Sequence, residues 1–175
     1  ANIAFAVRAR FVLLRDLGSA LSPTNAFNFI QGFETLPLRF KQHQDNAEKV
    51  ADFLVNKKNV NRVIHPKYQD GIYKERANKY LKNGKGPLVG FELDGGIEAG
   101  KAFIDSLELI YHVANIGDAR TLAIHPATTT HSQLNAEDQL RAGVTPGYIR
   151  LSVGIEHIDD IINDIDQAID KSQKN

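Results

Sequence analysis

The chain has 175 residues with 21 basic and 21 acidic side chains, so its formal net charge is zero. With this balance, nothing in the overall charge indicates binding to nucleic acid or to an acidic membrane surface. The absence of cysteine excludes disulfides and thiolate chemistry, and no apolar run approaches the roughly 20 residues of a membrane-spanning helix. We therefore expect one domain or two small units in the cytoplasm, with neither nucleic acid nor a membrane as partner.

The start of the chain is unusual because it has no initiator. Methionine is absent throughout, and Ala1 opens directly into a helical pattern without a cap or leader. We expect an incomplete chain, cut from something longer, with removal of an N-terminal methionine as the alternative.

The first third of the chain predicts helices. Residues 3–17 have apolar positions that suit a helix with more than one buried face, and a glycine follows it. Ser22 and Pro23 have the residue types of an N-cap and a first helical position. Pro37 lacks an amide donor, which predicts a break or a sharp kink there, and a second helix runs to about Asn56.

The remainder alternates between strand and helix patterns. Helices are predicted at 73–81, 97–107 and 135–142, and strands at 60–64, 88–93, 109–113, 121–124 and 148–153. A final helix has five isoleucines at helical spacing, from Ile158 to Ile169. The expected fold class is therefore α/β, with two leading helices followed by a small sheet covered by helices.

Arg150 interrupts the otherwise apolar last strand. Tyr148, Arg150 and Ser152 share one face of this strand, whereas Ile149, Leu151 and Val153 point to the other face. The apolar face can pack on the helix that follows, which leaves the guanidinium facing a surface or a cleft. Its planar fork suits a carboxylate or a phosphate, and a solvated or salt-bridged arginine is the alternative.

Three other motifs indicate ordinary structure more than chemistry. Gly95 to Lys101 satisfies the phosphate-binding pattern GxxxxGK, but Ala102 lacks the hydroxyl that would ligate Mg²⁺, so a Gly-Gly turn before a helix is favoured. His125 and His131 flank a threonine loop without further metal ligands, and no metal site is predicted. Residues 115–118 have the composition of an Asx-turn at the end of a strand.

Three long segments resemble a known family. The segments LRDLGSALSPTNAFNFIQGFETLPLR, ANIGDARTLAIHPATTTH and GYIRLSVGIEHIDDIINDIDQA resemble the C-terminal part of the pyridoxal-phosphate-dependent Cys/Met-metabolism enzymes. The resemblance runs in register from about Arg8 to Ala168. Gln31, Glu34 and the Asn-Ile-Gly-Asp of residues 115–118 favour the O-acetylhomoserine sulfhydrylase branch over the cystathionine synthases and lyases.

The resemblance implies the C-terminal small domain of a fold type I enzyme, with a mainly antiparallel sheet. Residues 1–57 would form a helical connection into this domain, and residues 58–175 would form the α/β domain that closes the substrate site. Arg150 falls on the arginine that binds the substrate α-carboxylate. Asn115 falls where the family commonly supports that carboxylate, and Thr130 falls on a threonine that lines the site near the cofactor.

The resemblance also implies pyridoxal 5′-phosphate as cofactor, held by an upstream domain that this sequence lacks. The family's Schiff-base lysine follows a Ser-x-Thr sequence, and no lysine here has that context. We therefore expect no catalytic and no cofactor-binding residue in this chain, which alone would be inactive.

The complete protein would make homocysteine from O-acetyl-homoserine and sulfide in methionine biosynthesis. Its expected partners are the amino-acid substrate, the missing N-terminal domain and further copies of itself, in a dimer or a tetramer. Two alternatives stay open: another trans-sulfuration enzyme, such as a cystathionine synthase or lyase or a methionine lyase, and a non-catalytic interaction domain or remnant.

Overall fold

The structure, a computed structural model, describes residues 3–174. Contacts within the chain divide it into two compact units, Ala1–Pro37 and Leu38–Asn175. Each unit is described by itself.

The first unit is helical, as predicted, but it has no core. Helices α1 (Ala4–Arg8), η1 (Ala9–Leu14, a π-helix) and α2 (Arg15–Leu17) follow one another directly, and α3 spans Pro23–Glu34. Ser22 caps α3, because its side chain accepts a hydrogen bond from the Asn25 amide at 3.2 Å. The expectation of more than one buried face for residues 3–17 is wrong for this structure, since none of these described helical residues is buried.

The predicted break near Pro37 is confirmed, but it lies slightly earlier. Helix α3 ends at Glu34, and α4 (Leu36–Asn56) begins two residues later. Pro37 is thus in the first turn of α4, where a backbone amide has no acceptor within the helix, so the lack of an amide hydrogen costs nothing. Further along α4, Val50, Ala51 and Leu54 are fully buried.

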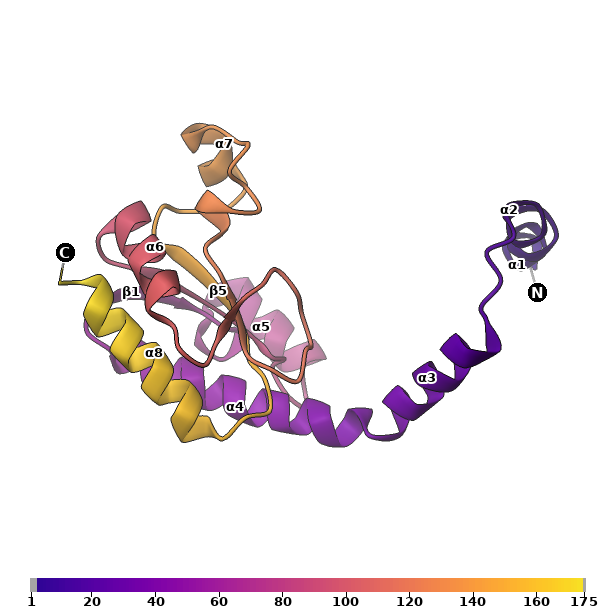
Figure 1. The fold of residues 1–175 in the computed structure, drawn as a ribbon, viewed down its shortest axis with the longest axis horizontal. Helices are drawn as coiled ribbons and strands as arrows, with labels where there is room; N and C mark the ends of the chain where they lie inside the picture. Colours follow the sequence, from indigo (N-terminus) through magenta and orange to yellow (C-terminus); the bar gives the residue numbers. More distant parts are fainter. Residues whose placement is uncertain (1–2, 175) are drawn as a thin grey trace. The chain divides into compact units, whose positions relative to one another are not determined.

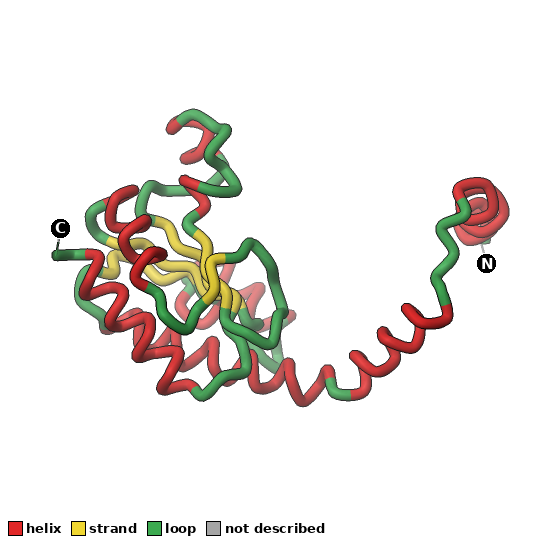
Figure 2. The backbone as a smooth tube through the Cα atoms, in the orientation of Figure 1, coloured by secondary structure: helices red, strands yellow, loops and turns green. Residues whose placement is uncertain are grey.

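The second unit contains a five-stranded sheet in the order β1-β2-β5-β4-β3. Only the pair β3–β4 is parallel among the described strand pairs, so the prediction of a mainly antiparallel sheet is confirmed. Figure 2 shows the strands in yellow with helices packed around them. The strands are β1 (Val60–Ile64), β2 (Leu88–Leu93), β3 (Tyr111–His112), β4 (Leu122–Ile124) and β5 (Tyr148–Ser152).

Strand β3 is shorter than the predicted 109–113, and a buried carboxylate explains why. Asp164 accepts hydrogen bonds from the backbone amides of Glu108, Leu109 and Ile110, each at 2.9 Å. Those amides are therefore not available for pairing with a neighbouring strand.

The predicted helices of this unit are confirmed, with bounds that differ by one or two residues. Asn135 caps α7, because its side chain accepts a hydrogen bond from the Asp138 amide at 2.9 Å. No helix of residues 3–174 is long and apolar enough to cross a membrane. The helices are η2 (Pro66–Tyr68), α5 (Gly71–Tyr80), α6 (Gly96–Ser106), η3 (Pro126–Thr128), α7 (Ala136–Arg141) and α8 (Ile158–Ser172).

One face of the sheet carries the core. Residues of α4, α6 and α8 pack against this face, with α4 and α8 drawn in purple and yellow in Figure 1. The rings of Phe91 and Phe103 meet edge to face, with centroids 5.5 Å apart. Ile149 and Leu151 of β5 are fully buried here. The alternation of β5 therefore sends Arg150 to the opposite face.

Candidate functional site

Arg150 lies at the centre of the sheet, on the face that the core helices do not cover. Strand β5 pairs with β2 on one side and β4 on the other, and these registers place Gly90 and Ile124 directly opposite Arg150. The predicted sharing of faces along β5 is confirmed, because Ile149 and Leu151 are buried in the core whereas Arg150 is only partly buried. A central strand thus presents one cation at a fixed position.

The loop after β3 folds back over Arg150. The Arg150 Nη2 atom donates a hydrogen bond to the Asn115 carbonyl oxygen at 3.2 Å, and the Gly117 amide donates to the Ser152 hydroxyl at 3.1 Å. Gly117 has a φ of 81°, a conformation that other residues rarely adopt, so it allows this turn. The structure therefore brings Asn115 and Arg150 together, and the support of a substrate carboxylate by Asn115 stays a prediction.

Asn115 contributes its backbone to this contact, and its side chain has another partner. The Asn115 Oδ1 atom accepts a hydrogen bond from the Ile116 amide at 2.9 Å, which stabilises the turn. The Asx-turn geometry lies instead at Asp118, whose Oδ1 accepts a hydrogen bond at 3.0 Å from the Arg120 amide two residues later. Asn115 thus holds one nitrogen of the guanidinium in place from a rigid loop.

Arg150 keeps unused hydrogen-bonding capacity. Its Nε atom is buried without a hydrogen-bond partner, and Arg150 makes no ion pair with any residue between 3 and 174. An unsatisfied buried donor costs about 1–3 kcal/mol, so such groups usually have a ligand or water as acceptor. Arg150 also lines a cleft of about 350 Å³. This arrangement fits a small anion such as a carboxylate.

Thr130 is not part of this contact network. It is exposed in the loop after η3, and its hydroxyl lies 2.8 Å from Nδ1 of His131. Within residues 3–174, no hydrogen bond joins Thr130 to Arg150 or Asn115. A role for Thr130 in the site stays a prediction.

The two histidines of the threonine loop have structural partners. His125 is buried, and its Nε2 donates to the Pro146 carbonyl at 2.7 Å while Nδ1 lies 2.9 Å from the Thr128 hydroxyl. Burial lowers the pKa of His125, and therefore favours the neutral ring. Among the described residues, no three His, Asp or Glu side chains lie where they could together hold a metal ion.

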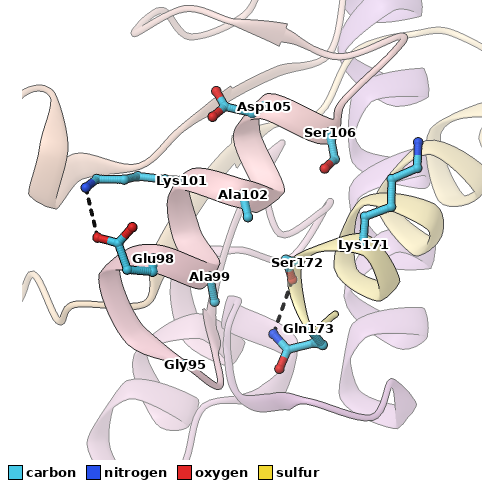
Figure 3. Close-up of a pocket in the computed structure, with 10 residues that line it drawn as sticks. All are labelled: Gly95, Glu98, Ala99, Lys101, Ala102, Asp105, Ser106, Lys171, Ser172 and Gln173. Atoms are coloured by element: carbon cyan, nitrogen blue, oxygen red, sulfur yellow. Dashed lines mark hydrogen bonds and ion pairs between the residues drawn. The ribbon is translucent and has the colours of Figure 1, made fainter. Parts of the chain in front are cut away.

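The GxxxxGK motif forms the start of α6 beside a surface groove that also contacts the end of α8 (Figure 3). Its lysine, Lys101, pairs with Glu98 at 2.9 Å, so that charge already has a partner. Its second glycine, Gly100, packs on the ring of His125, where an added Cβ would lie 2.5 Å from Nε2. Packing against His125 therefore explains the glycine at position 100, and no bound phosphate is needed to explain it.

The Gly100→Ala substitution is expected to destabilise the chain. The new methyl group would displace the His125 ring, which two hydrogen bonds hold, and overpacking of this kind costs about 1–3 kcal/mol. Urea unfolding measures the change in the free energy of unfolding. Lys101→Ala on the same helix is the control, because an exposed ion pair contributes only about 0–1 kcal/mol. A Gly100→Ala chain as stable as the parent would show that the ring moves freely.

Two of the lysines, Lys57 and Lys67, do not fit the anchoring of pyridoxal phosphate. A Schiff-base lysine must lose its proton, which a lowered pKa favours. At Lys57, burial lowers the pKa, but hydrogen bonds to Asp166 and Asp170 outweigh burial, and the pKa is raised. At Lys67, a hydrogen bond to Asp52 raises the pKa. These two lysines are stabilised as cations, the opposite of what the cofactor linkage needs.

The fold and the site together describe a small α/β domain with a partly buried arginine at the centre of its sheet, beside a cleft. A match to the family described as "Cys/Met metabolism PLP-dependent enzyme" spans residues 3–170. The chain belongs to this family, as the resemblance of its three long segments predicted.

Curated relatives agree with this assignment. The chain is 53% identical over 169 residues to an O-acetyl-L-homoserine sulfhydrylase of Leptospira meyeri, covering 96% of this chain and 38% of the relative. It is 47% identical over 168 residues to O-acetyl-L-homoserine sulfhydrylase 1 of Thermus thermophilus, covering 96% of this chain and 40% of the relative. The chain thus spans about two fifths of the length of the relatives that it matches.

A solved structure has the same fold. It is named as an O-acetylhomoserine (thiol)-lyase of Campylobacter jejuni, and it carries N′-pyridoxyl-lysine-5′-monophosphate. The two chains superpose with a TM-score of 0.87 at 42% identity, over 95% of this chain and 40% of the other. This confirms the predicted fold class, a domain of a fold type I enzyme.

Proposed function

We propose that this chain is the C-terminal part of a pyridoxal-phosphate-dependent O-acetylhomoserine sulfhydrylase. The complete enzyme would exchange the acetate of O-acetyl-homoserine for sulfide and release homocysteine, in the cytoplasm. The names of the relatives support the reaction, and their greater length supports the view that the activity belongs to a longer protein. The single observation that carries the role of this part is the buried, unpartnered Nε of Arg150 beside a cleft.

In this proposal Arg150 binds the substrate α-carboxylate. The guanidinium offers a planar pair of donors, and Asn115 restrains Nη2 from the side of the loop. Because the loop is fixed to β5 at both Arg150 and Ser152, the fork is oriented before the substrate arrives. Thr130 would line the site from the neighbouring loop after η3.

The remaining part of the enzyme would cover the first unit. Large apolar side chains there are exposed, and an apolar surface of this extent usually marks an interface. The proposed partners are the upstream cofactor domain and further copies of the enzyme, as a dimer or a tetramer. The side chains that are more than half exposed are Ile3, Phe5, Phe11, Leu17, Leu21, Phe27, Phe29, Ile30 and Phe33.

A nucleophile comparison in the complete protein tests the proposed reaction. With O-acetyl-homoserine as substrate, sulfide should yield homocysteine together with one acetate per turnover. Cysteine in place of sulfide should give little cystathionine. Rapid cystathionine formation would instead assign the protein to the synthase branch, and cleavage of cystathionine or methionine would assign it to the lyases.

The isolated chain is expected to form no cofactor linkage. After incubation with pyridoxal phosphate and borohydride reduction, its mass should show no stoichiometric addition at a single lysine, because no lysine of this chain follows the Ser-x-Thr sequence of the family's Schiff-base lysine. Peptide mass spectrometry locates any adduct. The complete enzyme, treated identically, is the positive control. A single specifically modified lysine in the isolated chain would contradict the proposal that the cofactor site lies elsewhere.

A further inference from the structure

Tyr148 is one of the two immediate neighbours of Arg150 on the same face of β5, and Ser152 is the other. The register of β5 with β2 places Gly90 opposite Arg150 and Glu92 opposite Tyr148. The Tyr148 ring does not stay above Glu92 but leans across Gly90. A Cβ atom at Gly90 would lie 2.7 Å from both Cε2 and the hydroxyl oxygen of Tyr148. Only a residue without a side chain at position 90 leaves room for this orientation.

The tyrosine and the arginine line the same cleft. Arg150, Tyr148 and Gly90 share a cleft of about 350 Å³ whose other walls include the apolar side chains of Leu88 and Ile64. The Nε atom of Arg150 is buried without an acceptor. The Tyr148 hydroxyl makes no hydrogen bond with any residue of the range 3–174 either. Two residues that each have a donor without an acceptor therefore line one small, partly apolar cleft.

The hydroxyl is a donor at neutral pH. Burial raises the pKa of Tyr148, and the negative charge of Glu92 adds to this effect, whereas the nearby charge of Arg150 opposes it without reversing it. The phenol therefore keeps its proton. Glu92 accepts a hydrogen bond from the Thr145 hydroxyl at 2.5 Å, so that carboxylate oxygen already has a donor.

We propose that the Tyr148 hydroxyl donates a second hydrogen bond to the α-carboxylate held by Arg150, and that Gly90 provides the room for its ring. This assignment rests on the proposed function, because it needs Arg150 to bind that carboxylate. Tyr148 then acts as a substrate-binding residue, and Gly90 acts as a positioning residue through it.

The Tyr148→Phe substitution in the complete enzyme tests the hydroxyl alone. Because a hydrogen bond to a charged acceptor is lost and the ring remains, KM for the amino-acid substrate should rise about 10-fold or more while kcat changes little. Tyr80→Phe is the control, since Tyr80 is 69% exposed on α5 and should leave both constants unchanged. A KM equal to that of the parent, or a fall in kcat alone, would overturn the assignment.

Gly90→Ala tests the positioning. The added methyl group should displace the Tyr148 ring and raise KM by a similar factor. In a chain that already has Tyr148→Phe, Gly90→Ala should raise KM little further, because the hydroxyl is then gone. Fully additive effects would show that Gly90 acts independently of Tyr148. If Arg150→Lys leaves KM unchanged, the proposed function itself fails. If Arg150→Lys raises KM strongly and Tyr148→Phe leaves KM unchanged, only the tyrosine assignment fails.

Discussion

Replacing Arg150 with lysine in the complete enzyme is expected to raise KM for the amino-acid substrate about 30- to 5,000-fold, the range that corresponds to the 2–5 kcal/mol cost of breaking a desolvated charge pair. A lysine keeps the charge but supplies a point cation on a flexible stem, and it cannot reproduce the planar fork. It also loses the contact from Nη2 to the Asn115 carbonyl that orients the group. Initial rates measured over a wide range of substrate concentration give the effect.

The matched control for this prediction is Arg62→Lys. Arg62 also lies in a strand of the same sheet, but it is exposed and paired in register with Glu92. Its replacement should leave KM and kcat near their original values. If Arg150→Lys behaved like Arg62→Lys, the carboxylate would have to bind elsewhere, and the role proposed for Arg150 would be wrong.

Asp164→Ala is expected to lower the free energy of unfolding by about 3–5 kcal/mol, since three backbone amides lose their acceptor, one of these contacts is buried and two are partly buried, and an unsatisfied buried donor costs about 1–3 kcal/mol. Asp164 is buried, with an exposed fraction of 6%, and its carboxylate joins α8 to the segment that leads into β3. The connection between α6 and β3 should therefore loosen first. Denaturant unfolding followed by circular dichroism measures the loss.

Two further variants make the Asp164 prediction robust. Asp164→Asn keeps one acceptor oxygen but turns an amide group toward the remaining donors, so its loss should be smaller than that of Asp164→Ala and the chain should still fold. Asp160→Ala, one turn earlier on α8, removes an exposed carboxylate and should cost less than about 1 kcal/mol. Equal losses at positions 160 and 164 would mean that the triple contact contributes little.

Local sequence patterns predicted the elements well. The isoleucines of α8 recur at helical spacing, and Ile161, Ile165 and Ile169 are all fully buried in the core. The alternation along β5 likewise predicted the face that Arg150 occupies. These predictions succeeded because periodicity records which side of an element is buried, and it needs no knowledge of the partner.

The contacts that shape the site were not predictable in the same way. Gly90 lies opposite Arg150 only because of the register of two strands that are about 60 residues apart in sequence, and a register has no local signature. The same holds for Asp164, which binds amides 54 to 56 residues away. Tyr148 was placed on the correct face, but its lean over Gly90 became apparent only once the pairing was known.

In residues 3–17 the apolar pattern did not predict which side chains are buried within this chain. The apolar pattern predicted burial, yet the side chains of Phe5 and Leu17 are 87% and 74% exposed. The pattern specifies that a surface is to be covered, without specifying which part of a protein covers it.

The sheet order has a consequence for how this domain is made. Strand β5 lies between β2 and β4, although it is the last of the five to be synthesised. A nascent chain that stops before Tyr148 therefore has two separate strand groups with unpaired central edges, which are prone to aggregation. Folding on the ribosome must wait until β5 has been made, in keeping with the slow formation of long-range β pairs. Factors that shield exposed strands during translation should therefore matter more for this domain than for one whose central strand comes first.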